Sequence, residues 1–241
     1  MLVYLILMVP PLLLALWAQY KVKSNFQRYS EVLNSSGMTG AQAAAEMCER
    51  MGLRVVGSSA EAKRLRDAVA IEITEGFLSD HYDPSDRTLR LSPDVYNGRS
   101  LSAVGVACHE AGHALQHAHG YAALQLRSTL VPTASFGSWL AFPILMAGVI
   151  MQASGLLLAG IILFSMVVLF QLVTLPVEFD ASARAKDSLE KFNIIRGGSE
   201  RDGVAAVLNA AALTYVAAAV SAVSTLLYYL YLYFMASQSN E

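Results

Sequence analysis

The sequence predicts a mainly α-helical membrane protein of the α+β class, with about four transmembrane helices and a small cytoplasmic core containing a short antiparallel sheet. Hydrophobic residues make up 55% of the 241 residues and charged residues only 15%. Three blocks of the chain contain no Asp, Glu, Lys or Arg: residues 1–20, 128–177 and 203–240. The segments between these blocks are charged and carry helix caps and turn residues, which indicates a folded part in contact with water.

The apolar blocks are long enough for four membrane spans, because about 20 apolar residues cross a bilayer. The first and third blocks each provide one span. The second provides two, over 131–151 and 155–175, with a tight turn at 152–154. The predicted organisation is, in order, an anchor helix (1–20), a cytoplasmic core (21–130), a transmembrane hairpin (131–177), a cytoplasmic helix (178–203) and a last transmembrane helix (204–236).

The first block is interpreted as an uncleaved anchor rather than as a cleaved signal peptide. No basic residue precedes its apolar core, whereas Lys21, Lys23 and Arg28 follow it, and this places the amino terminus outside the cell. In that orientation the two charged segments, residues 20–127 and 178–202, face the cytoplasm. They contain all 17 Lys and Arg residues, as the positive-inside rule requires.

Local signals predict the elements of the cytoplasmic core. Alternation of apolar and polar residues indicates strands, Asp-Pro indicates a hairpin turn, and Ser or Thr before an apolar periodic run indicates a helix start. The predicted elements are, in chain order, a helix over 41–51 capped by Thr39, a short helix over 58–67, a strand over 69–75, a hairpin of strands 77–82 and 88–92 about the turn 83–86, and a helix over 101–119 capped by Ser100.

The helix over 101–119 carries the motif His109-Glu110-Ala111-Gly112-His113. Two histidines four residues apart project from one face of a helix, so both imidazoles can reach one zinc ion. The glutamate between them lies beside that face, where it can take a proton from a metal-bound water. The alternative is a helix that carries two unrelated histidines on its surface.

A catalytic zinc requires a third protein ligand. His119 stands where a three-histidine signature places its last histidine, but that signature has a helix-breaking glycine at the position of Gln116. His117 is too far along the helix to share the ion. Glu178 is the first charge after the apolar hairpin, so the topology returns it to the same membrane face as the motif, and we predict it as the third ligand. Asp180 is its nearest competitor, or an acceptor for a histidine N–H.

The two cysteines are predicted to be buried, reduced thiols. Cys48 and Cys108 both fall in the cytoplasmic core, where disulfides are rare. Cys108 adjoins His109 but points about 100° away from the histidine face of the helix, so we do not expect it to bind the metal.

With these motifs the chain resembles the YugP-type neutral zinc metallopeptidases, a bacterial membrane-anchored family related in plan to HtpX-like proteases. The matching segments are 78–84, 89–92, 94–96, 109–117, 176–181 and 207–218. The resemblance implies a zincin-like (gluzincin) core, one catalytic Zn²⁺ and a glutamate third ligand, which falls on Glu178. HtpX-like relatives have an aspartate four residues after that ligand. Here Ser182 occupies that position and Asp180 is displaced, so the residue that orients a histidine ligand stays open.

The predicted function is peptide-bond hydrolysis by a membrane-anchored zinc metalloendopeptidase at the cytoplasmic face of the bacterial inner (plasma) membrane. His109, His113 and Glu178 bind the zinc, and Glu110 is the general base for a zinc-bound water. The expected partners are a peptide or protein substrate, membrane proteins included, and the lipid bilayer. A net charge of −2 and the lack of a basic tract give no indication of nucleic-acid binding.

Two other functions and one role stay open. An intramembrane site-2-type protease also uses this motif, but inside a span, whereas Arg99 and Arg127 flank the helix here. A membrane scaffold that binds zinc without catalysis is the second alternative. His81, Tyr82 and His117 are candidates for stabilising the oxyanion of the reaction.

Overall fold

The computed structural model describes residues 2–76 and 79–238. These residues form two compact units, each drawn from separate stretches of the chain. The apolar unit comprises the described residues within 1–18, 125–176 and 213–241, and the mixed unit comprises those within 19–124 and 177–212. Because the stretches alternate along the chain, neither unit is one contiguous segment.

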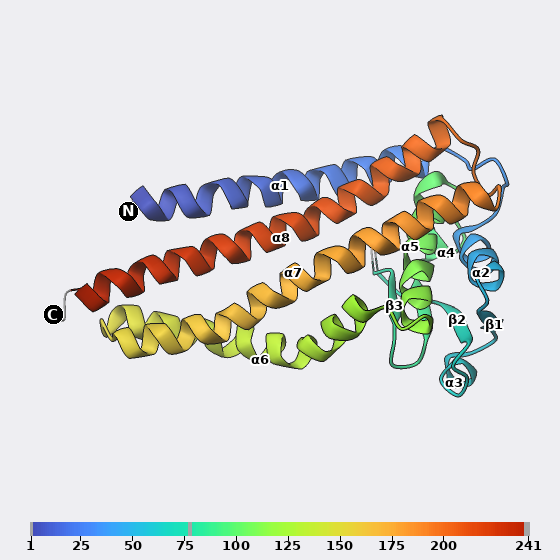
Figure 1. Ribbon diagram of the computed structural model, residues 1–241. Coiled ribbons are helices and arrows are strands. Elements are labelled where there is room, and N and C mark those ends of the chain that lie inside the picture. The colour runs from blue at the N-terminus through green and yellow to red at the C-terminus, as the bar shows by residue number, and fades with distance from the viewer. Residues whose placement is uncertain (1, 77–78, 239–241) are drawn as a thin grey trace. The chain divides into compact units, whose positions relative to one another are not determined.

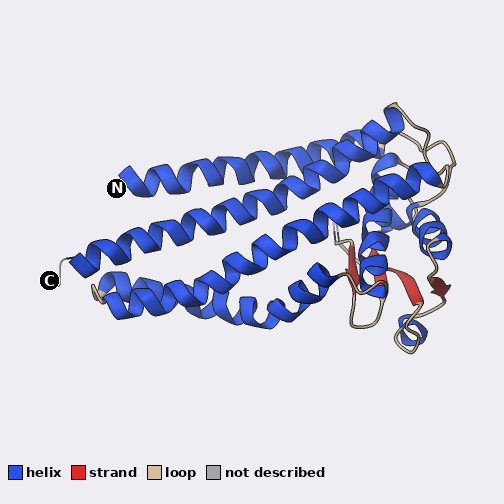
Figure 2. Ribbon diagram, viewed as in Figure 1, coloured by secondary structure: helices blue, strands red, loops and turns tan. Residues whose placement is uncertain are grey.

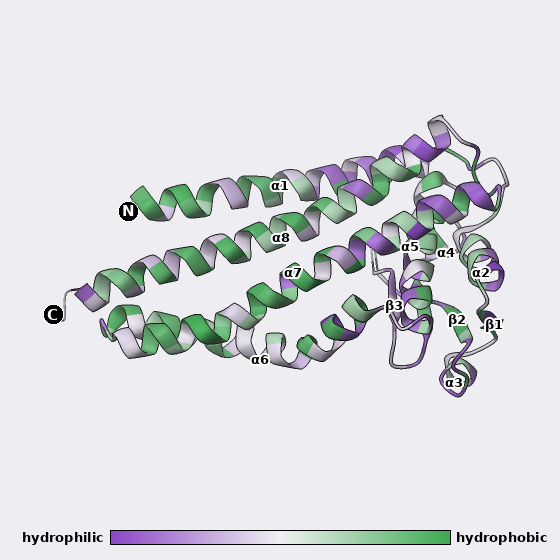
Figure 3. Ribbon diagram, in the orientation of Figure 1, coloured by the Kyte–Doolittle hydropathy of each residue, from purple (hydrophilic) through white to green (hydrophobic). Residues whose placement is uncertain are grey.

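Within the described residues, four helices are long and apolar enough to cross a membrane, as the sequence predicts. They are α1 (Leu2–Ser30), α6 (Ala122–Ile150), α7 (Ser154–Lys191) and α8 (Ser199–Gln238). Their stretches in the apolar unit are mainly green in Figure 3, the colour of hydrophobic residues. Large apolar side chains on these helices are exposed; for example, Trp139 is 75% and Ile150 is 73% exposed. Such an apolar surface is favourable in contact with lipid and unfavourable in contact with water.

Helix α7 continues through the boundary predicted at 177/178. It runs from Ser154 to Lys191 with Pro176 inside it, so the apolar stretch and Glu178 belong to one helix. Helix α8 likewise begins at Ser199, inside the segment predicted to precede the last span. The turn predicted at 152–154 separates α6 from α7, with Gln152 at a positive φ of 52°.

The mixed unit contains a four-stranded sheet of order β1-β2-β4-β3, drawn as red arrows in Figure 2. Its strands are β1 (Arg54–Val56), β2 (Ala68–Ile73), β3 (His81–Asp83) and β4 (Thr88–Leu91). Only β3 and β4 pair antiparallel, as predicted for their hairpin. The pairs β1–β2 and β2–β4 are parallel, so the expectation of an antiparallel sheet is wrong for them.

The physical reason lies in the connections between strands. Strand β1 reaches β2 through α3 (Ser59–Ala62), a crossover that brings the chain back in the same direction. The hairpin then inserts β4 beside β2 and leaves β3 at the edge. Of the strand predicted over 77–82, Phe77 and Leu78 lie outside the described residues. Helix α3, with Ser58 as its N-cap, is shorter than the predicted 58–67.

Helix α5 (Leu101–Ala118) lies at the centre of the mixed unit, against the sheet and α2 (Gly40–Arg50) (Figure 1). Both helices begin at the predicted caps. The Ser100 hydroxyl accepts the Ala103 N–H, and Thr39 forms a capping box with Gln42. A short helix, α4 (Pro93–Tyr96), precedes α5. The core around α5 contains fully buried apolar side chains, among them Met47, Leu89, Leu115 and Leu189.

Both cysteines are free and buried in this core, as predicted. Burial raises the pKa of the Cys48 thiol to about 12, and it raises the pKa of Cys108 as well. Both thiols therefore stay protonated at neutral pH, unlike the thiols of reactive cysteines.

Candidate metal centre

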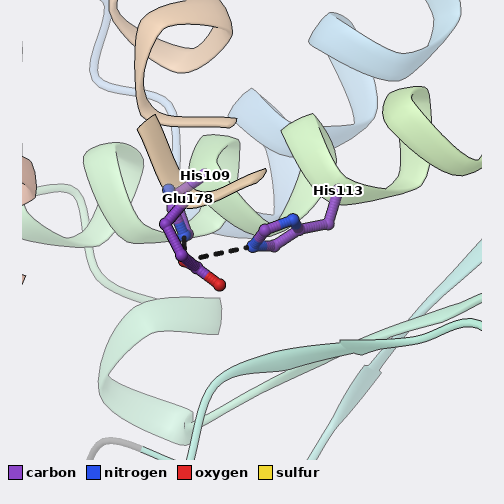
Figure 4. Close-up of side chains that lie close together, drawn as sticks. All are labelled: His109, His113 and Glu178. Carbon is purple, nitrogen blue, oxygen red and sulfur yellow. Dashed lines mark hydrogen bonds and ion pairs between the residues drawn. The ribbon is translucent and has the colours of Figure 1, made fainter. Parts of the chain in front are cut away.

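Three side chains predicted as ligands lie together in the mixed unit. His109 and His113 project from α5 and Glu178 from α7, and one ligand atom from each lies within 4.8 Å of the others. The Glu178 Oε2 atom is 3.2 Å from His109 Nε2 and 3.6 Å from His113 Nε2. Figure 4 shows this carboxylate turned toward both imidazole rings. His113 and Glu178 are buried, and His109 is partly buried.

Gly112 allows α7 to approach α5 closely at this point. A Cβ at position 112 would lie 2.8 Å from the Ala181 carbonyl oxygen, a distance that real Cβ atoms do not adopt. The glycine of the motif thus has a packing role, since it lets the turn of α7 that carries Glu178 rest on the turn of α5 that carries the histidines.

Gln116 fixes the proton position on His113. Its Nε2 group donates to the Val177 carbonyl oxygen at 2.8 Å and to Asp180 Oδ2 at 2.7 Å. Because both partners only accept, the amide cannot be flipped, and its Oε1 atom faces His113 Nδ1 at 3.0 Å. His113 therefore carries a proton on Nδ1 and turns its Nε2 atom toward Glu178.

This arrangement fits a bound cation. A ring nitrogen and a carboxylate oxygen that face each other in a buried place need a proton or a cation between them. Zinc prefers imidazole nitrogen and carboxylate oxygen, and a catalytic zinc takes three such ligands and keeps one open position. The donor set of two histidines and one glutamate matches that requirement.

The contacts behind the two histidines bear on the question left open around Asp180. The Ser182 hydroxyl, four residues after Glu178, lies 3.1 Å from His109 Nδ1. Asp180 lies behind Gln116, so it supports His113 through the amide, and Arg184 donates to it at 2.6 Å. Each of the two histidines thus has its own hydrogen-bonding partner on the far side of the ring, as histidines that bind metals commonly have.

Gln116 is the residue whose role the sequence did not reveal. In the sequence, Gln116 is notable only as the residue that replaces the glycine of a three-histidine signature. The available signal was its spacing, since a residue three positions after His113 lies on the same helix face and can reach its ring. The amide of Gln116 is completely buried, and a buried polar group requires hydrogen-bonding partners such as the three described above.

Glu110 lies beside the three predicted ligands and next to the edge of the sheet. Its buried Oε2 accepts the backbone N–H of Tyr82, in edge strand β3, at 2.9 Å. Burial raises the pKa of the Glu110 carboxyl, while the adjacent His109 and His113 oppose that rise. A carboxylate so placed is a proton acceptor of greater basicity than an exposed glutamate.

The other candidates lie outside the group of ligand atoms. His119 is the exposed C-cap of α5. His117 Nδ1 lies 2.8 Å from the Tyr82 hydroxyl, one turn beyond His113. His81 is exposed, and its Nδ1 lies 2.7 Å from the Ser79 carbonyl oxygen. Of the three candidates for oxyanion stabilisation, Tyr82 is hydrogen-bonded to Glu110, through its backbone N–H.

Comparison with known proteins gives this geometry its context. The family model described as "Putative neutral zinc metallopeptidase" matches residues 4–234. The chain belongs to this family. It is therefore a zinc metallopeptidase, a hydrolase of peptide bonds with zinc as its cofactor. A curated relative, "Putative membrane protease YugP" of Bacillus subtilis (strain 168), is 44% identical over 237 residues, which cover 98% of this chain and 99% of the relative. No solved structure matches the chain.

Replacing Gln116 by Met tests how the family's zinc is held in this chain. The substitution keeps the volume but removes the acceptor for His113 Nδ1 and the donor for Asp180. We expect zinc affinity to fall on the order of 10- to 100-fold, as for other outer-shell partners of metal ligands. Competition with a fluorescent zinc chelator measures this change. The exposed Gln27→Met variant is the matched control, and equal affinities in the two variants would contradict the assignment.

Proposed function

We propose that the protein is a membrane-anchored zinc metalloendopeptidase in which His109, His113 and Glu178 hold the ion and Glu110 is the general base. The observation that carries this proposal is the convergence of the three ligand atoms within 4.8 Å. The helix–sheet arrangement around them agrees with a zincin-like core of the gluzincin type. The intact Glu110 beside the ligands favours catalysis over a purely structural zinc site.

Each residue of the site has a chemical task in this proposal. When bound, zinc supplies Lewis acidity toward the scissile carbonyl and the attacking water. Glu110 takes the proton from that water and later delivers it to the leaving amine. The Tyr82 N–H holds one oxygen of Glu110 in place. Edge strand β3 offers backbone groups to which an extended substrate peptide can pair beside the ligands.

The intramembrane alternative receives less support from the structure. Helix α5 carries both histidines and is not among the four candidate spans found in the described residues. Its N-terminus follows Arg99, and Arg127 lies beyond its C-terminal end, near the start of α6. A site in the mixed unit, at the membrane surface, accords better with this distribution of charge.

Zinc removal tests the proposed function directly. The full-length protein in detergent is expected to contain one zinc per chain and to cleave unfolded casein. A strong chelator should abolish cleavage, and stoichiometric zinc should restore it, because the ion supplies the Lewis acid. Metal analysis and gel-based cleavage assays measure both quantities. One zinc per chain without any hydrolysis would instead favour the scaffold.

We further propose that the site faces the cytoplasm of the inner membrane, on the basis of the Lys and Arg distribution. A Gln152→Cys variant carries a thiol in the turn between α6 and α7. We expect a membrane-impermeant maleimide to label it in intact spheroplasts and to label Lys63→Cys only after lysis. The native thiols do not interfere because both are buried. The reverse labelling pattern would contradict this orientation.

A further inference from the structure

A pocket of about 110 Å³ lies in the mixed unit at the carboxyl-terminal end of α5. Its polar lining consists of Arg66, Tyr82, Arg87 and His117, and the rest of the lining is apolar. None of the described residues that line it is Asp or Glu. The pocket thus combines two guanidinium groups with apolar walls, and no acidic side chain in its lining compensates their charge.

The acidic residues nearest in sequence are already paired elsewhere. Asp67 pairs with Arg54 at 3.1 Å. Asp83 and Asp86 both pair with Arg90. Among the ion pairs between described residues, none uses Arg66 or Arg87. Their positive charge is therefore available to a ligand.

Arg87 is held over the pocket in an unusual backbone conformation. Its φ is +56°, in the left-handed region that favours glycine, although it bears a long side chain. Its guanidinium donates to the Lys63 carbonyl oxygen at 3.2 Å, which tethers the side chain. The charge of Arg87 also reaches His117, whose pKa is lowered first by burial and then by this arginine. Strain of this kind clusters at binding sites.

The pocket adjoins the metal centre through two residues. His117 lies one turn, about 6 Å, beyond His113 on α5. Tyr82 touches both places, since its N–H donates to Glu110 and its hydroxyl lies 2.8 Å from His117 Nδ1. An extended peptide advances about 3.3 Å per residue, so a substrate side chain within about two residues of the scissile bond can reach the pocket.

We propose that this pocket is a substrate subsite for the carboxylate of an Asp or Glu side chain, held by Arg66 and Arg87. Arginine suits this task because its planar fork binds a carboxylate through charge-assisted hydrogen bonds. The proposal rests on the proposed function and adds a substrate class to it: peptides with an acidic residue next to the cleaved bond.

Quenched fluorescent peptides with amidated carboxyl termini test the subsite in the full-length protein. One Glu is moved through three positions on each side of the cleaved bond, with Gln at the same position as the neutral partner. We expect kcat/KM to be about tenfold higher for Glu than for Gln at one position, on the order of one charge-assisted contact. A Glu-to-Gln ratio of one at every position overturns the proposal.

Variants that change the charge of single arginines test whether the preference for Glu peptides arises in this pocket. Arg66→Gln and Arg87→Gln should each reduce the ratio. Arg66→Glu, which sets one negative charge against the remaining Arg87, should bring the ratio to about one. Arg64→Gln, an exposed arginine outside the pocket lining, should keep the original ratio. Arg66 is itself exposed, so its variants test the proposal even if Arg87→Gln does not fold. A ratio that persists in Arg66→Glu overturns the proposal.

A binding measurement separates this subsite from the proposed function. Fluorescence anisotropy with the Glu and Gln peptides on the Glu110→Gln form needs no hydrolysis. Tighter binding of the Glu peptide that is lost in Arg66→Glu supports the subsite, even if the parent protein cleaves nothing. Equal binding of both peptides, together with cleavage of casein by the parent, leaves the proposed function intact and removes the subsite.

Discussion

Replacing Glu110 by Gln is expected to abolish peptide hydrolysis while one zinc per chain remains bound. The amide keeps the shape of the carboxylate and an acceptor for the Tyr82 N–H, but it cannot take a proton from water. General-base catalysis contributes about 10²- to 10⁴-fold, so kcat should fall by at least this factor. Steady-state cleavage of casein-derived peptides and zinc analysis on the same preparation measure the two effects.

Glu49→Gln, on the exposed side of α2, is the matched control and should retain full activity. The same preparation must unfold at the temperature of the parent protein, which excludes a loss of folded material as the cause. Full activity in Glu110→Gln would rule out the proposed mechanism and leave the base to another residue.

Replacing Glu178 by Gln is expected to remove both zinc and activity. The substitution takes away the one negative charge among the three ligands, where the carboxylate lies 3.2 and 3.6 Å from the two Nε2 atoms. Partners outside the ligand shell already change affinity about 10- to 100-fold, so we expect zinc affinity to fall by more than about 100-fold. Competition with chelators of graded affinity measures it.

Two other acidic residues of α7 provide comparison variants for the Glu178→Gln result. Asp180→Asn should weaken zinc binding only as an outer partner does, because Asp180 reaches His113 through Gln116. Glu190→Gln removes a surface ion pair with Arg201 and should leave zinc affinity unchanged. If Asp180→Asn lost zinc more completely than Glu178→Gln, the aspartate would be the ligand.

The sequence predicted those features that depend on local chemistry. Apolar blocks long enough to cross a bilayer as helices predicted the four candidate spans. Ser100 and Thr39 predicted the starts of α5 and α2. The four-residue spacing of His109 and His113 follows from helix geometry alone. The predicted membrane topology then placed Glu178 near them, because a transmembrane hairpin returns the chain to the membrane face at which the hairpin began.

Features that depend on contacts between distant segments were not predicted. The parallel pairing of β2 with β4 follows from insertion of β4 between β2 and β3, and no residue of β2 signals that choice. The hydrogen-bond chain from Asp180 to His113 runs through Gln116, so it forms only where α5 packs against α7. The extension of α7 through Glu178 was missed because a change from apolar to charged residues marks a membrane surface, which a helix can cross without a break.

The discontinuity of the mixed unit has a consequence for how the protein is made. The ribosome completes residues 19–124, with both histidines, before the segment Val177–Ala212 exists. Two apolar helices must leave the ribosome between them, and chains generally fold from the amino end as they emerge. A nascent or truncated chain that ends before α7 therefore has two of the three proposed ligands. In the proposed mechanism, proteolytic competence arises only after synthesis of the transmembrane hairpin.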